Sequence, residues 1–217
     1  MKPVPDWRLY LVTDRALAHP RPLEEIVRAA VRGGVTAVQL REKRCGIREF
    51  VVLARALKAG LPAGVPLIIN DRVDVALAAG ADGVHLGQSD LDYDDARRLL
   101  GPDRFIGLSV ETMEQALAAE CLDVDYLGVS PIFSTPTKTD TGGAWGIEGL
   151  RLLRAQSRHR LIAIGGLNQG NAREVVGAGA DGIAVVSAVC AAPEPESAAR
   201  ELRRIIDGGL RSSVPLL

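Results

Sequence analysis

One joint between a helix-like and a strand-like segment recurs three times along the chain. Residues 34–40, 80–86 and 179–185 read Gly-Val-Thr-Ala-Val-Gln-Leu, Gly-Ala-Asp-Gly-Val-His-Leu and Gly-Ala-Asp-Gly-Ile-Ala-Val. In each copy a glycine suits the left-handed position that closes a helix, and an apolar strand follows after a short turn. Repetition of one helix-to-strand joint is typical of a barrel or a solenoid built from βα units.

Strand-like and helix-like segments alternate over the whole chain. We place apolar strands at residues 9–14, 37–42, 66–71, 83–88, 105–110, 126–131, 161–166 and 182–187. We place helices at residues 22–33, 47–59, 72–79, 92–100, 112–120, 147–156, 169–178 and 195–207. Such alternation builds a parallel sheet, and eight pairs close a barrel, whereas an open doubly wound sheet usually stops at about five or six strands. The sequence therefore predicts an α/β fold in which residues 1–217 form one (βα)8 TIM barrel, with a loose tail at 209–217.

Composition argues against several classes of partner. The net charge is -1 over 217 residues, so the chain has no broad basic field for nucleic acid or an anionic membrane. Aromatic residues make up 4% of the chain, which disfavours a surface on which bases stack. We therefore expect small-molecule partners, no nucleic acid and no membrane, with a homo-oligomer as an open alternative.

The cysteines and the start of the chain indicate the compartment. Cys45, Cys121 and Cys190 are odd in number, far apart and without the spacing of metal ligands, which is typical of thiols in a reducing environment. Residues 1–10 are polar, contain two prolines and lack the apolar stretch of a signal peptide. We expect a cytoplasmic protein.

The end of the second strand carries two cations on one face. Side chains alternate along a strand, so Gln39, Arg41 and Lys43 share a face while Leu40 points the other way. Because the apolar side chains must meet the outer helices, Gln39 and Arg41 should point into the barrel, with Lys43 just above. Two cations at the mouth of a barrel suit a multiply charged anion. The alternative is a pair of surface ion pairs with Glu42.

Two aspartates end the third and fourth strands, which should be neighbours. Asp71 and Asp90 could share a hard cation there, and Mg²⁺ prefers a few carboxylates together with water and phosphate oxygens. Each could instead cap the helix that follows it, since aspartate is a common N-cap. Beside the two cations the pair favours a metal site. Asn70 could donate to a phosphate through its amide or merely cap a turn.

A long loop and two short motifs predict a second anion site. Residues 133–146 follow the sixth strand with several hydroxyls, Lys138 and flanking glycines, which suits a lid over phosphate; a plain connecting loop is the alternative. Gly165 and Gly166 follow the seventh strand, and residues 186–187 follow the eighth, where TIM barrels commonly bind phosphate. Simple turns are the alternative for the glycines.

The remaining chemistry is limited. His85 lies in the middle of a strand and is interpreted as a core residue, and no catalytic triad, zinc spacing, Rossmann fingerprint or P-loop occurs. No poised general base is evident. The residues predict two anion sites, one with the cations of the second strand and Mg²⁺, and the other across the seventh and eighth strands. This pattern fits a transferase that activates a diphosphate leaving group by neutralising its charge.

A resemblance to a known family rests on seven motifs that occur in order, within a match that runs from about the first strand to the eighth. They are Gln39-Leu40-Arg41-Glu42-Lys43, Asn70-Asp71-Arg72, His85-Leu86-Gly87-Gln88-Ser89-Asp90, Gly107-Leu108-Ser109, Thr135-Pro136-Thr137-Lys138, Ile164-Gly165-Gly166 and Val186-Ser187. Together they resemble thiamine phosphate synthase. The resemblance implies the joining of a hydroxymethylpyrimidine diphosphate to a thiazole phosphate by dissociative substitution, with Mg²⁺ as cofactor.

The resemblance also implies roles for particular residues. The implied pyrimidine diphosphate contacts are Gln39, Leu40, Arg41, Glu42, Lys43, Asn70, Ser109 and Lys138, of which Arg41, Lys43 and Lys138 act electrostatically in catalysis. The implied thiazole phosphate contacts are Thr135, Pro136, Thr137, Gly166, Val186 and Ser187, and the implied Mg²⁺ ligands are Asp71 and Asp90. Two alternatives stay open. A thiazole tautomerase would not need the diphosphate and metal set, and a non-catalytic barrel that binds a phosphate ligand would have no use for the aspartate pair.

Overall fold

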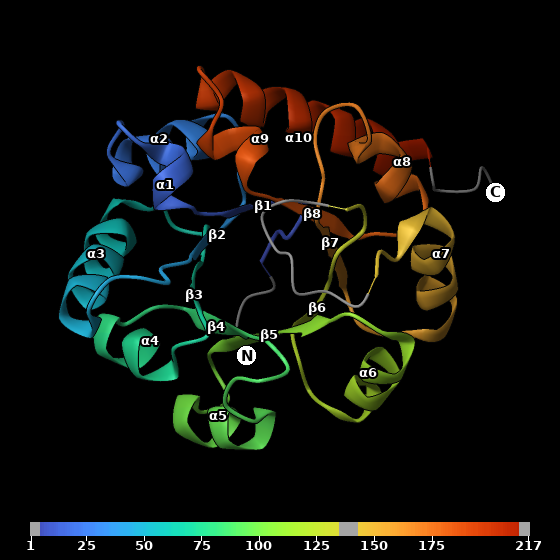
Figure 1. The fold of residues 1–217 in the computed structure, drawn as a ribbon, viewed down its shortest axis with the longest axis horizontal. Coiled ribbons are helices and arrows are strands. Elements are labelled where there is room, and N and C mark those ends of the chain that lie inside the picture. Colours follow the sequence, from blue (N-terminus) through green and yellow to red (C-terminus); the bar gives the residue numbers. More distant parts are fainter. Residues whose placement is uncertain (1–4, 135–142, 213–217) are drawn as a thin grey trace.

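The computed structural model describes residues 5–134 and 143–212, and Figure 1 looks along a closed barrel of strands surrounded by a ring of helices. All eight strands pair in parallel in the order β1-β2-β3-β4-β5-β6-β7-β8, and β8 pairs with β1 to close the barrel. The predicted (βα)8 barrel is confirmed. The strands are β1 (Leu9–Val12), β2 (Ala37–Leu40), β3 (Leu67–Asn70), β4 (Gly83–Leu86), β5 (Phe105–Val110), β6 (Tyr126–Val129), β7 (Leu161–Ile164) and β8 (Gly182–Val185).

The eight predicted helices are all present, and short helical turns that the sequence did not indicate stand beside them. The predicted ones are α2 (Leu23–Arg32), α3 (Ile47–Gly60), α4 (Val73–Ala79), α5 (Tyr93–Leu100), α6 (Met113–Ala118), α7 (Gly146–Gln156), α8 (Ala172–Gly177) and α10 (Pro195–Ser212). The additional turns are α1 (Arg15–Ala18) and α9 (Ser187–Cys190), and η1 (Ala119–Cys121) follows α6 directly and overlaps the end of the helix predicted at 112–120. Each is about one turn long, too short to show the periodicity that identifies a helix in sequence.

The last helix corrects one expectation. Helix α10 continues to Ser212, so residues 209–212 are helical rather than part of a loose tail, and residues 213–217 lie outside the described part of the chain. The helix packs against α2 and α8. A Cβ at Gly209 would lie 3.4 Å from Val176 of α8, so the small residue allows close packing where the sequence suggested a break.

An aspartate explains two of the three copies of the helix-to-strand joint, those at residues 80–86 and 179–185. Asp82 accepts a hydrogen bond from the Leu67 amide at 2.7 Å, and Asp181 accepts one from the Leu161 amide at 2.8 Å. Each carboxylate therefore satisfies the first N–H of the strand before its own. Each is also paired with a basic side chain from the helix before that neighbouring strand: Lys58 of α3 lies 2.6 Å from Asp82, and Arg154 of α7 lies 3.0 Å from Asp181. The joint ties two neighbouring βα units together at the amino end of the barrel.

Two separate apolar cores result. The larger lies between the sheet and the helices, and a smaller one fills the lower barrel around Trp7, Tyr10, Phe105 and Tyr126. The Trp7 ring centroid is 4.6 Å from that of Tyr126 and 5.6 Å from that of Tyr10. Aromatic pairs at such separations contribute about 0.5–1.5 kcal/mol beyond their burial. This aromatic cluster closes the inside of the barrel below the cavity, and the side of the cavity that it forms is called the floor.

Candidate functional site

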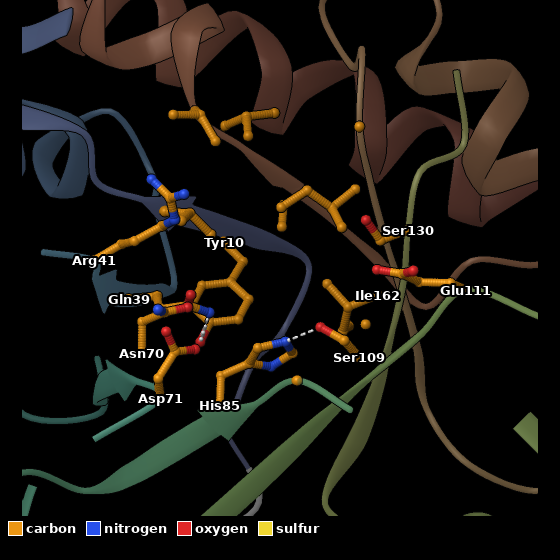
Figure 2. A pocket seen from close by; sticks show the side chains of 18 of the residues that line it. Tyr10, Gln39, Arg41, Asn70, Asp71, His85, Ser109, Glu111, Ser130 and Ile162 are labelled. Carbon is orange, nitrogen blue, oxygen red and sulfur yellow. Dashed lines mark hydrogen bonds between the residues drawn. The ribbon is translucent and has the colours of Figure 1, made fainter. Parts of the chain in front are cut away.

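A cavity of about 770 Å³ opens at the carboxyl ends of the strands. In Figure 2 Gln39, Asn70 and Asp71 lie on one side of it, and Ser109, Glu111 and Ser130 lie on the other. Its lining includes Tyr10, Val12, Gln39, Arg41, Lys43, Asn70, Asp71, His85, Gln88, Asp90, Ser109, Glu111, Tyr126, Ser130, Ile162, Ile164, Gly165, Gly166, Val186 and Ser187. All eight strands or the segments just after them contribute, as the fold requires of its site.

Two cations stand at the rim beyond β2. The Arg41 backbone N–H donates to Thr13 Oγ1 at 3.0 Å, which ties the end of β2 to the end of β1. Its guanidinium lies 3.8 Å from the Asp14 carboxylate, and Lys43 Nζ lies 2.6 Å from Asp71 Oδ2. The expected alternative, ion pairs with Glu42, does not describe these contacts. Both cations line the cavity, where an anion could reach them.

The two aspartates face the same part of the cavity. Asp71 has a positive φ of 62°, and its N–H donates to the His85 carbonyl at 2.8 Å, so β4 holds the residue in the left-handed region. Asp90 Oδ2 accepts from the Gly87 N–H at 2.7 Å. Burial raises the pKa of Asp90, and the nearby Asp71 carboxylate raises it further. A carboxylate whose ionisation is opposed by a neighbouring carboxylate forms with it a site whose negative charge a cation would relieve.

Neither aspartate caps the helix that follows it. The N-cap of α4 is Arg72, which makes no side-chain cap, and the N-cap of α5 is Asp92, whose carboxylate accepts from the Asp94 N–H. The capping alternative is therefore not what the structure shows for Asp71 and Asp90. Their donor set suits Mg²⁺, which is usually bound through one or two carboxylates plus water and phosphate oxygens. Within the described residues no group of three or more His, Cys, Asp or Glu could hold a metal ion.

A chain of hydrogen bonds crosses the floor of the cavity. Gln39 Nε2 donates to Tyr10 OH at 3.2 Å, and the hydroxyls of Tyr10 and Tyr126 are 2.9 Å apart. Tyr126 OH lies 3.0 Å from His85 Nδ1, and His85 Nε2 lies 2.8 Å from Ser109 Oγ; Figure 2 shows this last bond. Burial raises the pKa of both phenols, so both stay protonated at neutral pH. The floor of the cavity therefore carries neutral phenol groups that are hydrogen-bonded to polar side chains.

The opposite wall comes from β7 and β8. Gly165 and Gly166 have φ values of 104° and 69°, which favour glycine. A Cβ at Gly165 would lie 2.7 Å from Pro131, and one at Gly166 would lie 2.9 Å from Phe133. There is therefore no room for a side chain at either position. Ser187 begins α9 directly after this wall. The first N–H groups of a helix have no acceptor within it, which suits an anion.

Comparisons with known proteins agree on one family. Residues 9–189 match the family described as thiamine monophosphate synthase. Thiamine-phosphate synthase of Albidiferax ferrireducens is 62% identical over 201 residues, which cover 92% of each chain. The enzyme of the same name from Syntrophomonas wolfei is 54% identical over 92% of this chain and 96% of its own. A solved thiamine phosphate pyrophosphorylase from Pyrococcus furiosus superposes with a TM-score of 0.86 at 41% identity, covering 94% of this chain and 98% of its own.

This chain belongs to the thiamine monophosphate synthase family. The resemblance drawn from the seven motifs is thereby confirmed. A 3-hexulose-6-phosphate synthase superposes with a TM-score of 0.67 at 18% identity, which shows a shared fold only. No described helix is both long and apolar enough to cross a membrane.

The structure brings most of the sequence-predicted site residues of this family member into one cavity. Gln39, Arg41, Lys43, Asn70, Asp71, Asp90, Ser109, Gly166, Val186 and Ser187 line it. Leu40 is fully buried in the outer core, and Glu42 pairs with Arg15 at 3.1 Å. Neither is among the cavity-lining side chains. Thr135, Pro136, Thr137 and Lys138 lie outside the described residues.

Several cavity residues escaped the sequence reasoning. His85 is only partly buried and lines the cavity, so its interpretation as a core residue is wrong, because its side chain points inward above the aromatic floor. Tyr10, Tyr126 and Glu111 were not singled out. The alternation of side chains along a strand could have indicated Tyr10, since it lies between the outward Leu9 and Leu11 of β1.

Proposed function

We propose that this protein is a transferase that joins 4-amino-2-methyl-5-(diphosphooxymethyl)pyrimidine to a thiazole phosphate and releases thiamine phosphate and pyrophosphate. The thiazole substrate is hydroxyethylthiazole phosphate or its carboxylated form. The observation that carries the proposal is one cavity in which two cations and two carboxylates face a glycine-lined wall, in a chain 62% identical to a thiamine-phosphate synthase.

The reaction needs charge stabilisation more than proton transfer. The bond from the pyrimidine methylene to the diphosphate oxygen breaks, and its electron pair leaves with pyrophosphate. The thiazole nitrogen then gives its lone pair to the methylene carbon, which forms the new C–N bond. With hydroxyethylthiazole phosphate no proton moves in either step, which agrees with the absence of a poised base among the sequence motifs.

Arg41 and Lys43 would bind the diphosphate and stabilise the charge that develops on the leaving group. The Arg41 guanidinium can donate two parallel hydrogen bonds to phosphate oxygens, and its backbone is already held by Thr13. Lys43 is 53% exposed in its side chain and could exchange its contact with Asp71 for a phosphate oxygen. Fixed charges that need no rearrangement at the moment of reaction are the usual source of such stabilisation.

Asp71 and Asp90 would hold Mg²⁺ beside these cations. The ion would supply positive charge that neutralises the diphosphate. Without it, the two carboxylates would repel the anionic substrate, so their position in the cavity is hard to explain by substrate binding alone. Asn70 lies next to Asp71 and is 8% exposed, so its amide could donate to the same substrate.

The wall formed by β7 and β8 would receive the thiazole phosphate. Gly166, Val186 and Ser187 line it, and the Ser187 hydroxyl and backbone N–H groups are suitable phosphate donors. Thr135, Pro136 and Thr137 would add contacts to the same substrate, and Lys138 would reach the diphosphate. This second group of residues follows from the family resemblance only.

A two-substrate assay tests the function. Purified protein with both substrates should form thiamine phosphate and pyrophosphate in equal amounts, and chelation of Mg²⁺ should abolish the reaction.

Asp71→Ala and Asp90→Ala should cripple turnover and its Mg²⁺ dependence while leaving the circular dichroism spectrum unchanged. Asp92→Ala, which alters only the cap of α5, is the matched control. Full activity of either cavity variant at limiting Mg²⁺ would refute the shared cation.

The same assay separates the alternatives. A thiazole tautomerase would convert the carboxylated thiazole without pyrophosphate release, and a phosphate-binding barrel without activity would bind and release both substrates unchanged.

The three cysteines are unpaired thiols in the structure, which supports the expected reducing, cytoplasmic setting.

A further inference from the structure

The hydrogen-bonded chain on the cavity floor joins two substrate-facing residues through two buried tyrosines. Its ends, Gln39 and Ser109, are residues for which the family resemblance implies pyrimidine diphosphate contacts. Its centre is Tyr10 and Tyr126, which are 1% and 0% exposed and come from β1 and β6. No substrate contact is implied for either phenol, and each hydroxyl is used within the chain.

The direction of one bond sets the direction of all the others. Each phenol has a single proton, and a neutral imidazole has one N–H and one acceptor nitrogen. The Gln39 amide nitrogen donates to Tyr10. If Tyr126 also donated to Tyr10, the buried Tyr10 proton would have no acceptor within the hydrogen-bonded chain, so the arrangement that uses every proton has Tyr10 donating to Tyr126. Tyr126 then donates to His85 Nδ1, which places the imidazole proton on Nε2. His85 donates that proton to Ser109 Oγ, and the Ser109 hydroxyl can donate into the cavity.

The surroundings make this arrangement rigid. Trp7 packs against both tyrosine rings, and the Tyr126 ring stacks on His85 at a centroid distance of 5.5 Å and an angle of 18°. A buried polar group without a partner is costly, and hydrogen bonds in series polarise one another in a medium of low dielectric constant. Loss of any one of these hydrogen bonds would therefore leave a buried polar group unpaired and destabilise the arrangement.

Resting on the proposed function, we propose that Tyr10 and Tyr126 are positioning residues for the pyrimidine substrate. Their hydroxyls hold the Gln39 amide with its carbonyl oxygen available to the cavity as an acceptor, and they set Ser109 as a hydrogen-bond donor. An aminopyrimidine carries an amine that donates and ring nitrogens that accept. One fixed acceptor and one fixed donor match that pair of functions, so the floor recognises the aminopyrimidine ring while the rim binds its diphosphate.

Conservative removal of single hydroxyls tests the kinetic part. Tyr10→Phe and Tyr126→Phe keep the rings that pack on Trp7 but break the chain at different points. Each should raise the KM for the pyrimidine diphosphate about tenfold, the effect of about one hydrogen bond, and leave the KM for thiazole phosphate unchanged. Tyr93→Phe, at the third tyrosine and outside the cavity on α5, is the matched control and should change neither value. Wild-type KM values in both cavity variants would overturn the inference.

Nitrogen NMR tests the polarity of the chain without any substrate. At a pH where imidazole is neutral, ¹⁵N shifts should place the His85 proton on Nε2 in the wild type, with His85→Gln used to assign the signals. Tyr126→Phe should lose this single tautomer, and Tyr93→Phe should keep it. A wild-type proton on Nδ1 would overturn the assigned direction. If the wild type forms no thiamine phosphate, the proposed function fails, and the NMR result alone tests the direction of the hydrogen bonds. If the wild type forms thiamine phosphate but Tyr10→Phe and Tyr126→Phe keep its KM values, only the positioning role is rejected.

Discussion

Arg41 shows how much of a site can depend on the shape of one side chain. A guanidinium presents paired donors in a plane, whereas an ammonium is a point charge, so Arg41→Lys should not be conservative. We expect the barrier of the transfer step to rise by about 2–4 kcal/mol, by analogy with the loss of an oxyanion donor. The measurement is kcat/KM for the pyrimidine diphosphate. Arg44→Lys, exposed in the same segment, is the control, and an unchanged kcat/KM in Arg41→Lys would contradict a bidentate contact.

Cys190 links a single buried thiol to stability at alkaline pH. Burial raises its pKa from 9.0 to about 11, and its side chain is 0% exposed. Above about pH 9 the unfolded chain releases this proton while the folded chain keeps it, so folding stability should fall between about pH 9 and pH 11 and not below. The loss should be at most about 3 kcal/mol, since each pKa unit corresponds to about 1.4 kcal/mol.

Chemical denaturation across this pH range measures the effect. Cys190→Ala should lower the stability at neutral pH but flatten its alkaline decline, because the titrating thiol is gone. Cys121→Ala removes an exposed thiol and should keep the wild-type decline. An alkaline slope that is the same in all three proteins would show that other groups cause it.

At the scale of the elements, glycines in the strands set how closely neighbouring strands approach. A Cβ at Gly83 of β4 would lie 2.2 Å from the Phe105 carbonyl oxygen and 2.7 Å from the Phe105 Cβ. Backbone must then move, so Gly83→Ala should lower the free energy of unfolding by more than about 2 kcal/mol. In contrast, a Cβ at Gly60, the last residue of α3, meets nothing within 4 Å. Gly60→Ala should be neutral or stabilise by up to about 1 kcal/mol. Equal unfolding free energies for both variants in urea would contradict this packing argument.

At the scale of the whole molecule, ligand binding and folding are linked, because the cavity exists only when all eight strands are closed. Pyrophosphate with Mg²⁺ at about 100 times its dissociation constant should stabilise the fold by about 2.7 kcal/mol. For a chain of this size the melting temperature should rise by roughly 5–10 °C. Asp90→Ala should lose most of this rise and Asp92→Ala should keep it, as measured by calorimetry. An equal rise in both variants would place the anion away from the aspartates.

The sequence by itself determined the parts that depend on neighbours along the chain. Apolar runs and glycine joints predicted every strand and its start to within one residue, and alternation within β2 separated Gln39, Arg41 and Lys43 from Leu40. The motifs at the strand ends were also local, and they carried both the family and the cavity residues that end β2, β3, β7 and β8.

Only the tertiary structure decided what meets across the barrel. Tyr10 and Tyr126 are 116 positions apart, yet their hydroxyls lie 2.9 Å from each other. No local pattern distinguishes an inward tyrosine that fills a core from one that bonds a substrate-facing glutamine. The positive φ of Asp71 likewise depends on its bond to His85 in the next strand. Side-chain periodicity reports which face a residue occupies, whereas the partner on that face is fixed by strand order, register and closure of the barrel, which are properties of the whole chain.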